Sequence, residues 1–252
     1  MGAARTGRAV TTVALALAAT VLLGETTADA TAPSPCNPYY PLPAGGSWTY
    51  REGPLGGKPR VEKLVTVKSI EGQGARRTAV LEQSVRTPGA PGLAAGQART
   101  VVHCDRGRIG LTVRGAAQGR EGTSTSTGTV TAEIPGLPPA DELVPGYEWK
   151  SKSTIRARDG ELHTETIGSR TSRVAGRESV TVPAGRYPSA LKIIAVETLE
   201  QRGPVRSAQQ ELVEWYAQGI GLVKRETRVR SGSSAATSVE VLVATNLGAS
   251  EN

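Results

Sequence analysis

Apolar and polar residues alternate along two stretches of the chain, residues 149–158 and residues 223–230. Small or apolar side chains occupy one set of positions, and mostly charged or hydroxyl-bearing side chains occupy the other; Arg225 is the one charged residue in the apolar set. A period of two is typical of an antiparallel strand with one covered face and one wet face. The basic residues of the two wet faces are Lys150, Lys152, Arg156, Arg158, Lys224, Arg228 and Arg230.

Further strand-like runs are separated by Gly, Pro and Arg-Gly turns, and no helical period of apolar residues is visible. The first half contains Ser47–Arg51, Val61–Ile70, Arg76–Val85, Ala98–Asp105 and Ile109–Arg114. The second half contains Glu148–Arg158, Glu161–Val174, Glu178–Val182, Ala190–Leu199, Ala208–Tyr216, Leu222–Arg230 and Ala235–Thr245. This arrangement predicts an all-β or β-dominated protein, with an antiparallel curved sheet, half-barrel or sandwich. Apolar residues occupy both sets of positions in Ala190–Leu199, which predicts a central strand covered on both faces.

Two stretches of similar sequence, residues 102–114 and 213–225, suggest a strand-rich unit that is used twice. We therefore expect two similar halves, with a first β unit at residues 47–114 and a second at residues 141–247. The segment 115–140 between them is rich in Gly, Ser and Thr, which predicts a linker or an edge strand. Residues 248–252 are expected to form a frayed tail.

Residues 1–30 have the features of a signal peptide. Arg5 and Arg8 precede an apolar stretch at residues 10–24, and Ala28-Asp29-Ala30 forms an A-x-A cleavage site. The apolar stretch is shorter than the roughly 20 residues that a transmembrane helix requires. These features predict a secreted or periplasmic protein that has no transmembrane span and is cleaved near Ala30.

The two cysteines, Cys36 and Cys104, both follow the signal peptide. In an oxidising compartment they are expected to form a structural disulfide. The bond would tie a Pro-rich lead, residues 31–46, to the strand that ends at Asp105. The lead cannot be helical and is expected to lie across the surface. A catalytic cysteine would need a base beside it, and His103 points to the opposite face of the strand.

Composition and motifs argue against several classes of function. The net charge of +7 is unchanged when residues 1–30 are removed, and the basic residues are spread along the chain without a basic helix, so we expect no nucleic-acid binding. The sequence lacks the Gly-x-Ser-x-Gly, His-Glu-x-x-His, phosphate-loop and Cys-x-x-Cys patterns. We expect no enzymatic activity, no cofactor and no metal. The glutamates expected to be solvated or salt-bridged are Glu197, Glu200, Glu211 and Glu214.

Two motifs stand out in the second half. Residues 180–187 read V-T-V-P-A-G-R-Y, which predicts a hairpin because Pro presets φ and Gly permits a positive φ. Residues 214–224 read E-W-Y-A-Q-G-I-G-L-V-K, which predicts a strand that ends in an aromatic pair, followed by a bend or bulge at the two glycines. Trp215 and Tyr216 are expected on opposite faces.

These motifs, together with the openings at residues 39–42 and 46–50, resemble a group of exported bacterial proteins that are sometimes labelled TapB-like. They are also similar to domain-of-unknown-function families that resemble the LolA/LolB lipoprotein-carrier half-barrel. The resemblance implies a curved antiparallel sheet that wraps a helix or a hydrophobic ligand, without enzymatic activity. This chain departs from the pattern in lacking a clear helical segment and in having few large apolar residues.

Two hypotheses for function follow. The first is an exported, non-enzymatic β-protein of the cell envelope that binds a hydrophobic or lipid-like ligand on the concave face of its sheet. Its candidate lining residues are Trp149, Trp215 and Tyr216, with Ile193 or Ile194 behind them. The alternative is a structural or interaction module that binds anionic cell-wall polymer, or a protein partner, through the basic sheet faces. Both hypotheses leave the oligomeric state open.

Overall fold

The computed structural model describes residues 36–88, 94–121, 124–159, 161–202, 206–231 and 234–247. The expected signal peptide, residues 1–30, and the expected tail, residues 248–252, lie outside the described residues. The twelve strands are β1 (Ser47–Pro54), β2 (Val61–Gln73), β3 (Arg76–Arg86), β4 (Ala94–Asp105), β5 (Arg108–Glu121), β6 (Ser124–Pro135), β7 (Glu148–Asp159), β8 (Leu162–Val182), β9 (Gly185–Arg202), β10 (Arg206–Ala217), β11 (Gly221–Ser231) and β12 (Ser234–Thr245). Within the described ranges, no helix has the length and apolarity needed to cross a membrane.

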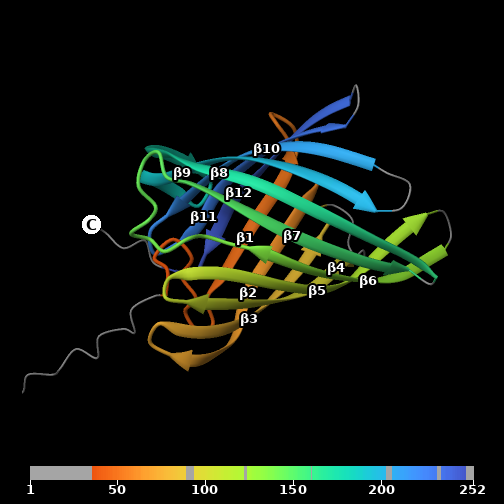
Figure 1. Cartoon of the computed structure of the whole chain (residues 1–252), viewed down its shortest axis with the longest axis horizontal. Coiled ribbons are helices and arrows are strands. Elements are labelled where there is room, and N and C mark those ends of the chain that lie inside the picture. Colours follow the sequence, from red (N-terminus) through yellow and green to blue (C-terminus); the bar gives the residue numbers. More distant parts are fainter. Residues whose placement is uncertain are drawn as a thin grey trace, which may run out of the picture. The chain divides into compact units, whose positions relative to one another are not determined.

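The strands form one closed antiparallel barrel (Figure 1). Each strand pairs with its neighbours in sequence, and β1 closes the ring by pairing with β12 from Trp48↔Thr245 to Pro54↔Ser238. The prediction of an all-β, curved antiparallel sheet is therefore confirmed. Because the sheet closes on itself, it has neither the open edges of a half-barrel nor the two layers of a sandwich.

The two similar stretches of sequence fold as equivalent hairpins. Residues 102–114 span the end of β4, a turn and the start of β5, and residues 213–225 span the end of β10, a turn and the start of β11. Successive strands run in opposite directions, so alternate turns lie at the same end of the barrel and these two hairpins share an end. Gly219 and Gly221 have φ of 76° and 99°, in agreement with the bend predicted at these two glycines. The bulge lies earlier, where the pairing of β10 with β11 shifts between Trp215 and Tyr216.

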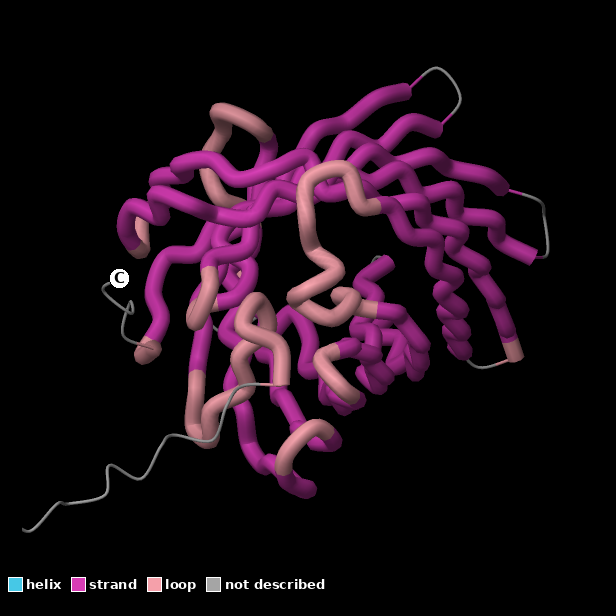
Figure 2. Tube along the Cα trace, turned by 60° about the vertical axis from the view of Figure 1, so that its left-hand side comes forward, coloured by secondary structure: helices cyan, strands magenta, loops and turns pink. Residues whose placement is uncertain are grey.

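Loops close this end of the barrel, and they are pink inside the ring of strands in Figure 2. Asn37 is fully buried, and its Nδ2 atom donates to the backbone oxygens of Gly107 (2.8 Å) and Pro138 (2.9 Å). Cys36 and Cys104 form a disulfide, the pairing expected from the sequence. The described part of the Pro-rich lead, residues 36–46, is therefore a plug that closes the barrel and is held by buried hydrogen bonds. The expectation that the lead lies across the surface is wrong.

The apolar core lies against this plug. Trp48 is buried, and its Nε1 atom donates to the backbone oxygen of Ile220 at 2.7 Å. Tyr39, Leu143 and Leu242 are buried in the same cluster. Removal of these side chains from water is the main stabilisation of a sheet that otherwise has few large apolar residues.

Residues 115–140 are neither a linker nor a simple edge strand. They are divided between β5, β6 and the loop 136–147, and β6 pairs with β5 along its whole length. β6 also pairs with β7 from Thr129 to Glu133, whereas residues 124–128 pair with β5 alone among the strands that the structure describes. Residues 129–133 of β6 therefore complete the ring between β5 and β7.

Two further expectations about strands need correction. The runs expected at Glu161–Val174 and Glu178–Val182 are one strand, β8, because bulges flank Gly176 (φ 140°) and the pairing with β9 continues past them. Strand β9 is not covered on both faces, since Ile194 and Val196 are 44% and 40% exposed. They belong to the outer face of the barrel, where no second layer packs against β9 in the described part of the chain.

Candidate functional site in the barrel interior

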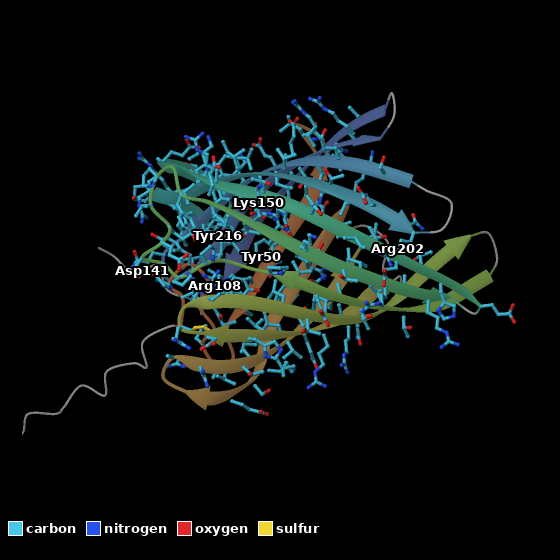
Figure 3. All side chains as sticks on the ribbon, viewed as in Figure 1. Tyr50, Arg108, Asp141, Lys150, Arg202 and Tyr216 are labelled. Carbon is cyan, nitrogen blue, oxygen red and sulfur yellow. A yellow bond between two sulfur atoms is a disulfide. The ribbon has the colours of Figure 1, made fainter. Side chains whose placement is uncertain are left out.

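A cavity of about 350 Å³ lies inside the barrel. Among the described residues, every strand except β9 and β12 contributes to its lining, together with the plug residues Tyr40 and Pro41. Tyr50 and Tyr216, both labelled in Figure 3, lie in the half of the barrel nearest Asp141, which belongs to the closing loop 136–147. The cavity therefore lies toward the closed end of the barrel, and part of its lining, including Trp48, Leu81 and Ile220, belongs to the apolar core.

The cavity has two chemically different sides. One arc of the barrel wall, from β2 to β7, is mainly apolar, and its side chains include Val65, Leu81, Leu111, Val113, Ile134 and Trp149. The other arc, from β8 through β10 and β11 to β1 and β2, carries polar and charged groups: Arg170, Glu214, Tyr216, Arg225, Tyr50 and Lys63. A largely apolar wall with a few convergent polar groups is the usual composition of a small-molecule site.

The charged groups form a chain of alternating sign. Arg170 Nη2 lies 2.6 Å from Glu214 Oε2, and Arg225 Nε lies 2.8 Å from Glu214 Oε1. Arg225 Nη1 continues the chain to Glu240 Oε2 at 3.2 Å, and Lys63 Nζ pairs with Glu240 Oε1. Register brings these residues together, because Glu214 faces Arg225 across β10 and β11, and Arg225 faces Glu240 across β11 and β12.

Glu214 is held as a carboxylate by its neighbours. Burial alone raises its pKa, but the guanidinium groups of Arg225 and Arg170 outweigh burial, and the pKa lies below its ordinary value of 4.5. A depressed pKa means that the carboxylate binds protons poorly at neutral pH, which makes it a poor general base. The geometry therefore favours an electrostatic role over an acid–base role.

Three tyrosines complete the polar side. Burial raises the pKa of Tyr40 to about 12 and raises the pKa of Tyr50 and Tyr216 above 10, so all three hydroxyls are protonated at neutral pH. The Tyr50 hydroxyl donates to the backbone oxygen of Leu222 at 3.1 Å. The hydroxyls of Tyr40 and Tyr216 have no hydrogen-bond partner among the described residues and border the cavity.

The structure separates the candidate lining residues proposed from the sequence. Trp149 and Tyr216 line the cavity. Ile193 points inward but is fully buried in the core cluster and lies outside the lining. Ile194 and Trp215 are on the outer face, so the expectation that they line a concave ligand site is wrong.

Trp215 faces outward because Glu214 and Tyr216, on either side of it, face inward. Its Nε1 atom donates to Glu178 Oε1 at 2.7 Å, and the Nζ atoms of Lys192 and Lys224 lie 5.5 and 4.7 Å from its ring centroid. These cation–π contacts cover the indole, which explains how a tryptophan is buried on the outside of a sheet.

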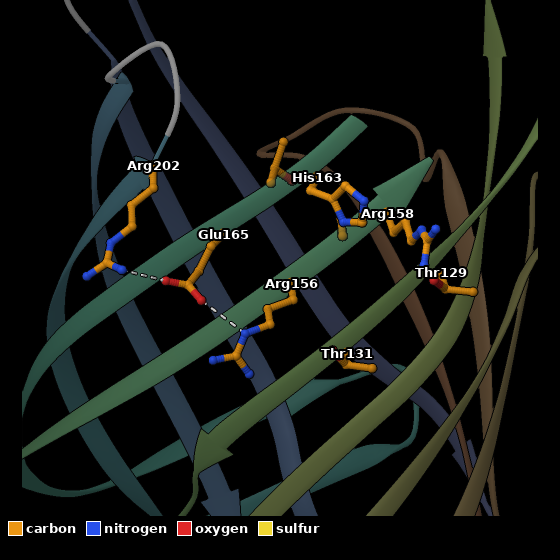
Figure 4. Close-up of a pocket in the computed structure, with 9 residues that line it drawn as sticks. Thr129, Thr131, Arg156, Arg158, His163, Glu165 and Arg202 are labelled. Atoms are coloured by element: carbon orange, nitrogen blue, oxygen red, sulfur yellow. Dashed lines mark hydrogen bonds and ion pairs between the residues drawn. The ribbon is translucent and has the colours of Figure 1, made fainter. Parts of the chain in front are cut away.

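The basic residues predicted to share a wet face do lie on the outer face of β7 and β11. Several are already paired: Lys224 with Glu226, and Arg228 and Arg230 with Glu211. On β7, Lys150 and Lys152 are exposed. Figure 4 shows Arg156 and Arg202 on either side of Glu165, at 3.0 and 3.1 Å, in an outer groove of about 420 Å³ that Arg158 also lines.

Sequence reasoning missed the internal charge chain. Arg225 was the available signal, since it is the charged residue that interrupts the apolar set of β11. Glu214 was expected to be salt-bridged, and it is, but inside the barrel. Among the described residues, no three His, Cys, Asp or Glu side chains lie close enough together to hold a metal ion.

The barrel is similar to two solved structures. A "putative lipoprotein" from Parabacteroides distasonis has a TM-score of 0.61 and 15% identity, over 84% of this chain and 99% of that one. A "putative exported protein with YmcC-like fold" from Bacteroides fragilis has a TM-score of 0.59 and 17% identity, over 84% of this chain and 100% of that one. At such identities the likeness establishes the fold alone.

Comparison with curated proteins gives no match. A family model described as DUF3108-like matches residues 62–239, which run from β2 into β12. The match covers well over half of the chain, and the protein therefore belongs to the DUF3108-like family.

Proposed function

We propose that this protein is an exported, non-enzymatic binding protein whose barrel holds a hydrophobic or lipid-like ligand. The observation that carries the proposal is the internal cavity of about 350 Å³, with an apolar arc facing a polar arc. Its volume lies in the range of about 300–1,000 Å³ that is usual for ligand sites. The similarity to lipoprotein carriers inferred from the sequence motifs belongs to this proposal, with the interior of a closed barrel in place of a concave half-barrel.

Three observations support a place in the cell envelope. Residues 1–30 have the pattern of a signal peptide. The disulfide between Cys36 and Cys104 suits an oxidising compartment. The two structural neighbours are described as a lipoprotein and an exported protein, and we extend that location to this chain as part of the proposal.

The chemistry of the cavity supports binding over catalysis. Its carboxylate Glu214 contacts two guanidinium groups and has a lowered pKa. The tyrosine hydroxyls have raised pKa values and are poor nucleophiles at neutral pH. Neither kind of group is prepared for proton transfer or covalent attack.

A neutral fluorescent apolar probe, N-phenyl-1-naphthylamine, tests the proposal with delipidated protein. We expect its fluorescence to rise on binding, and we expect Leu111→Trp, which fills the apolar arc, to weaken binding at least about tenfold. Thr112→Trp is the matched control, because the next residue of β5 points to the outer face. Absence of binding to the wild type, or equal loss in both variants, would contradict an internal site.

A second candidate function is the binding of an anionic envelope polymer. The observation that favours it is the outer groove of Figure 4, where Arg156 and Arg202 flank one carboxylate, Glu165, and Arg158 lines the same groove. Capture of the protein by purified cell wall should then weaken with salt and with the double change Arg156→Gln and Arg202→Gln, since salt screens exposed charges. Capture that survives high salt would count against this function.

A further inference from the structure

The lining of the cavity carries a net positive charge. Among the described residues that line it, Lys63, Arg170 and Arg225 are cations, and Glu214 is the one carboxylate. Glu240, behind the lining, completes the alternating chain from Arg170 to Lys63 and brings its sum to one excess positive charge. Another inward carboxylate, Glu197, is hydrogen-bonded to Ser153 and Gln210 and is not part of the lining.

The series of ion pairs inside the barrel begins with one cation, Arg170, and ends with another, Lys63. In the part of the chain that the structure describes, Glu214 and Glu240 each contact two cations, whereas Arg170 and Lys63 each contact a single carboxylate. A cation in a partly desolvated interior gains most from a further anionic partner, because the local dielectric constant is low and water competes less. The two ends of the chain are therefore the positions where the barrel has unused capacity to bind negative charge.

Hydrogen-bond donors lie beside this excess charge. The hydroxyls of Tyr40 and Tyr216 border the cavity without a partner among the described side chains and backbone. Both hydroxyls are protonated at neutral pH, since burial raises their pKa. Protonated hydroxyls donate well to an anionic oxygen, and hydrogen bonds to charged groups are about twice as strong as neutral ones.

The opposite arc has the chemistry of an alkyl-chain site. Leu81, Leu111, Val113, Ile134 and Trp149 present apolar surface toward the charged arc. A cavity of about 350 Å³ holds roughly a dozen water molecules at about 30 Å³ each, which is the space of one alkyl chain of moderate length. Two acyl chains and a large headgroup do not fit such a volume.

We infer that the ligand is a single-chain anionic amphiphile. Its negative headgroup lies against Lys63, Arg170 and Arg225 on the polar side of the cavity, and its alkyl chain lies against the apolar side. This inference rests on the proposed function, and it adds the ligand's charge, its number of chains and its orientation. A neutral amphiphile of the same length would leave the excess positive charge of the five ion-paired groups from Arg170 to Lys63 uncompensated.

Isothermal titration calorimetry of the delipidated protein with decanoate, decanol and decylamine at pH 7 tests the inference. We expect decanoate to bind at least about tenfold more tightly than decanol, and decylamine to bind less tightly than decanol. Lys63→Met should lower the affinity for decanoate about tenfold and leave that for decanol unchanged. Lys68→Met is the control, because Lys68 is on the same strand and half-exposed beside Glu82 on the outer face.

The possible outcomes separate the inference from the function it rests on. Equal binding of decanoate and decanol to the wild type would overturn the anionic ligand and leave the apolar binding function standing. No binding of any of the three compounds would overturn both. If Lys63→Met does not fold, the comparison of acid, alcohol and amine on the wild type decides the inference alone.

Discussion

The substitution Glu214→Gln tests whether the internal charge chain holds the barrel together. The side chain of Glu214 is 2% exposed and contacts Arg170 at 2.6 Å and Arg225 at 2.8 Å. Removal of one partner from a buried ion pair costs about 3–5 kcal/mol, because the remaining charge is left uncompensated. The two arginine side chains are 22% and 33% exposed, so we expect the lower end, about 3 kcal/mol.

Glu211→Gln is a closely matched control. Glu211 lies on the same strand and also contacts two arginines, at 3.8 and 3.4 Å, but it is 42% exposed on the outer face. Exposed pairs contribute little, so its loss should change the free energy of unfolding by less than about 0.5 kcal/mol.

Urea unfolding at pH 7 measures both variants. For Glu214→Gln we expect a lower midpoint with an unchanged m-value, and a melting temperature lower by about 6–12 °C at about 2–4 °C per kcal/mol. If Glu214→Gln destabilises the protein no more than Glu211→Gln, the argument from burial and ion pairing is refuted.

Three further predictions concern the plug, the acid response and the packing of the closed end. Replacement of both Cys36 and Cys104 by Ser should lower the free energy of unfolding by about 4 kcal/mol on the chain-entropy model for a separation of 68 residues. Equal urea midpoints of the wild type with and without reductant would contradict this prediction. The pKa of Glu214 is lower in the folded protein than its ordinary value of 4.5, so the ionised side chain stabilises the fold at pH values above 4.5. This stabilisation is lost as the pH falls through the folded-state pKa, and the wild type should therefore lose more stability between pH 7 and pH 3 than Glu214→Gln does. Gly136→Ala should lower the free energy of unfolding by about 1–3 kcal/mol, because its Cβ would lie 2.7 Å from a methyl carbon of Ile109. A Cβ at Gly110 would meet nothing within 4 Å, so Gly110→Ala should leave the thermal unfolding temperature nearly unchanged.

The alternation of residues along the chain predicted the strands and which residues share a face. The closure of the sheet and the covering of its faces depend on pairing between strands that are far apart in the sequence. Alternation in residues 149–158 correctly placed Trp149 inside and its basic neighbours outside. Pairing of β1 with β12 joins residues nearly 200 positions apart, and no local pattern distinguishes a closed ring from an open sheet. Ile194 shows the same limit, since its apolar character does not reveal that no layer covers the outer face of β9 in the described structure.

The residues of the cavity could be predicted only where local alternation along a strand identifies them. Alternation placed Trp215 and Tyr216 on opposite faces, but both were named as lining candidates, because a period of two does not say which face lies inside the barrel. The meeting of Arg170 with Glu214, 44 residues apart, depends on how β8, β9 and β10 align, which the sequence does not state. Arg225 was visible as an interruption of an apolar face, but its carboxylate partners were not.

A crystal structure of the protein with a terminally brominated decanoate shows whether the barrel interior holds the amphiphile, because anomalous scattering locates the bromine without assumptions about the ligand's pose. The account predicts bromine against Leu111 and Trp149 inside the barrel, with the carboxylate within hydrogen-bond distance of Lys63 or an arginine of the charged arc. Bromine on the outer face, or an interior that holds only ordered water at saturating ligand, would contradict it.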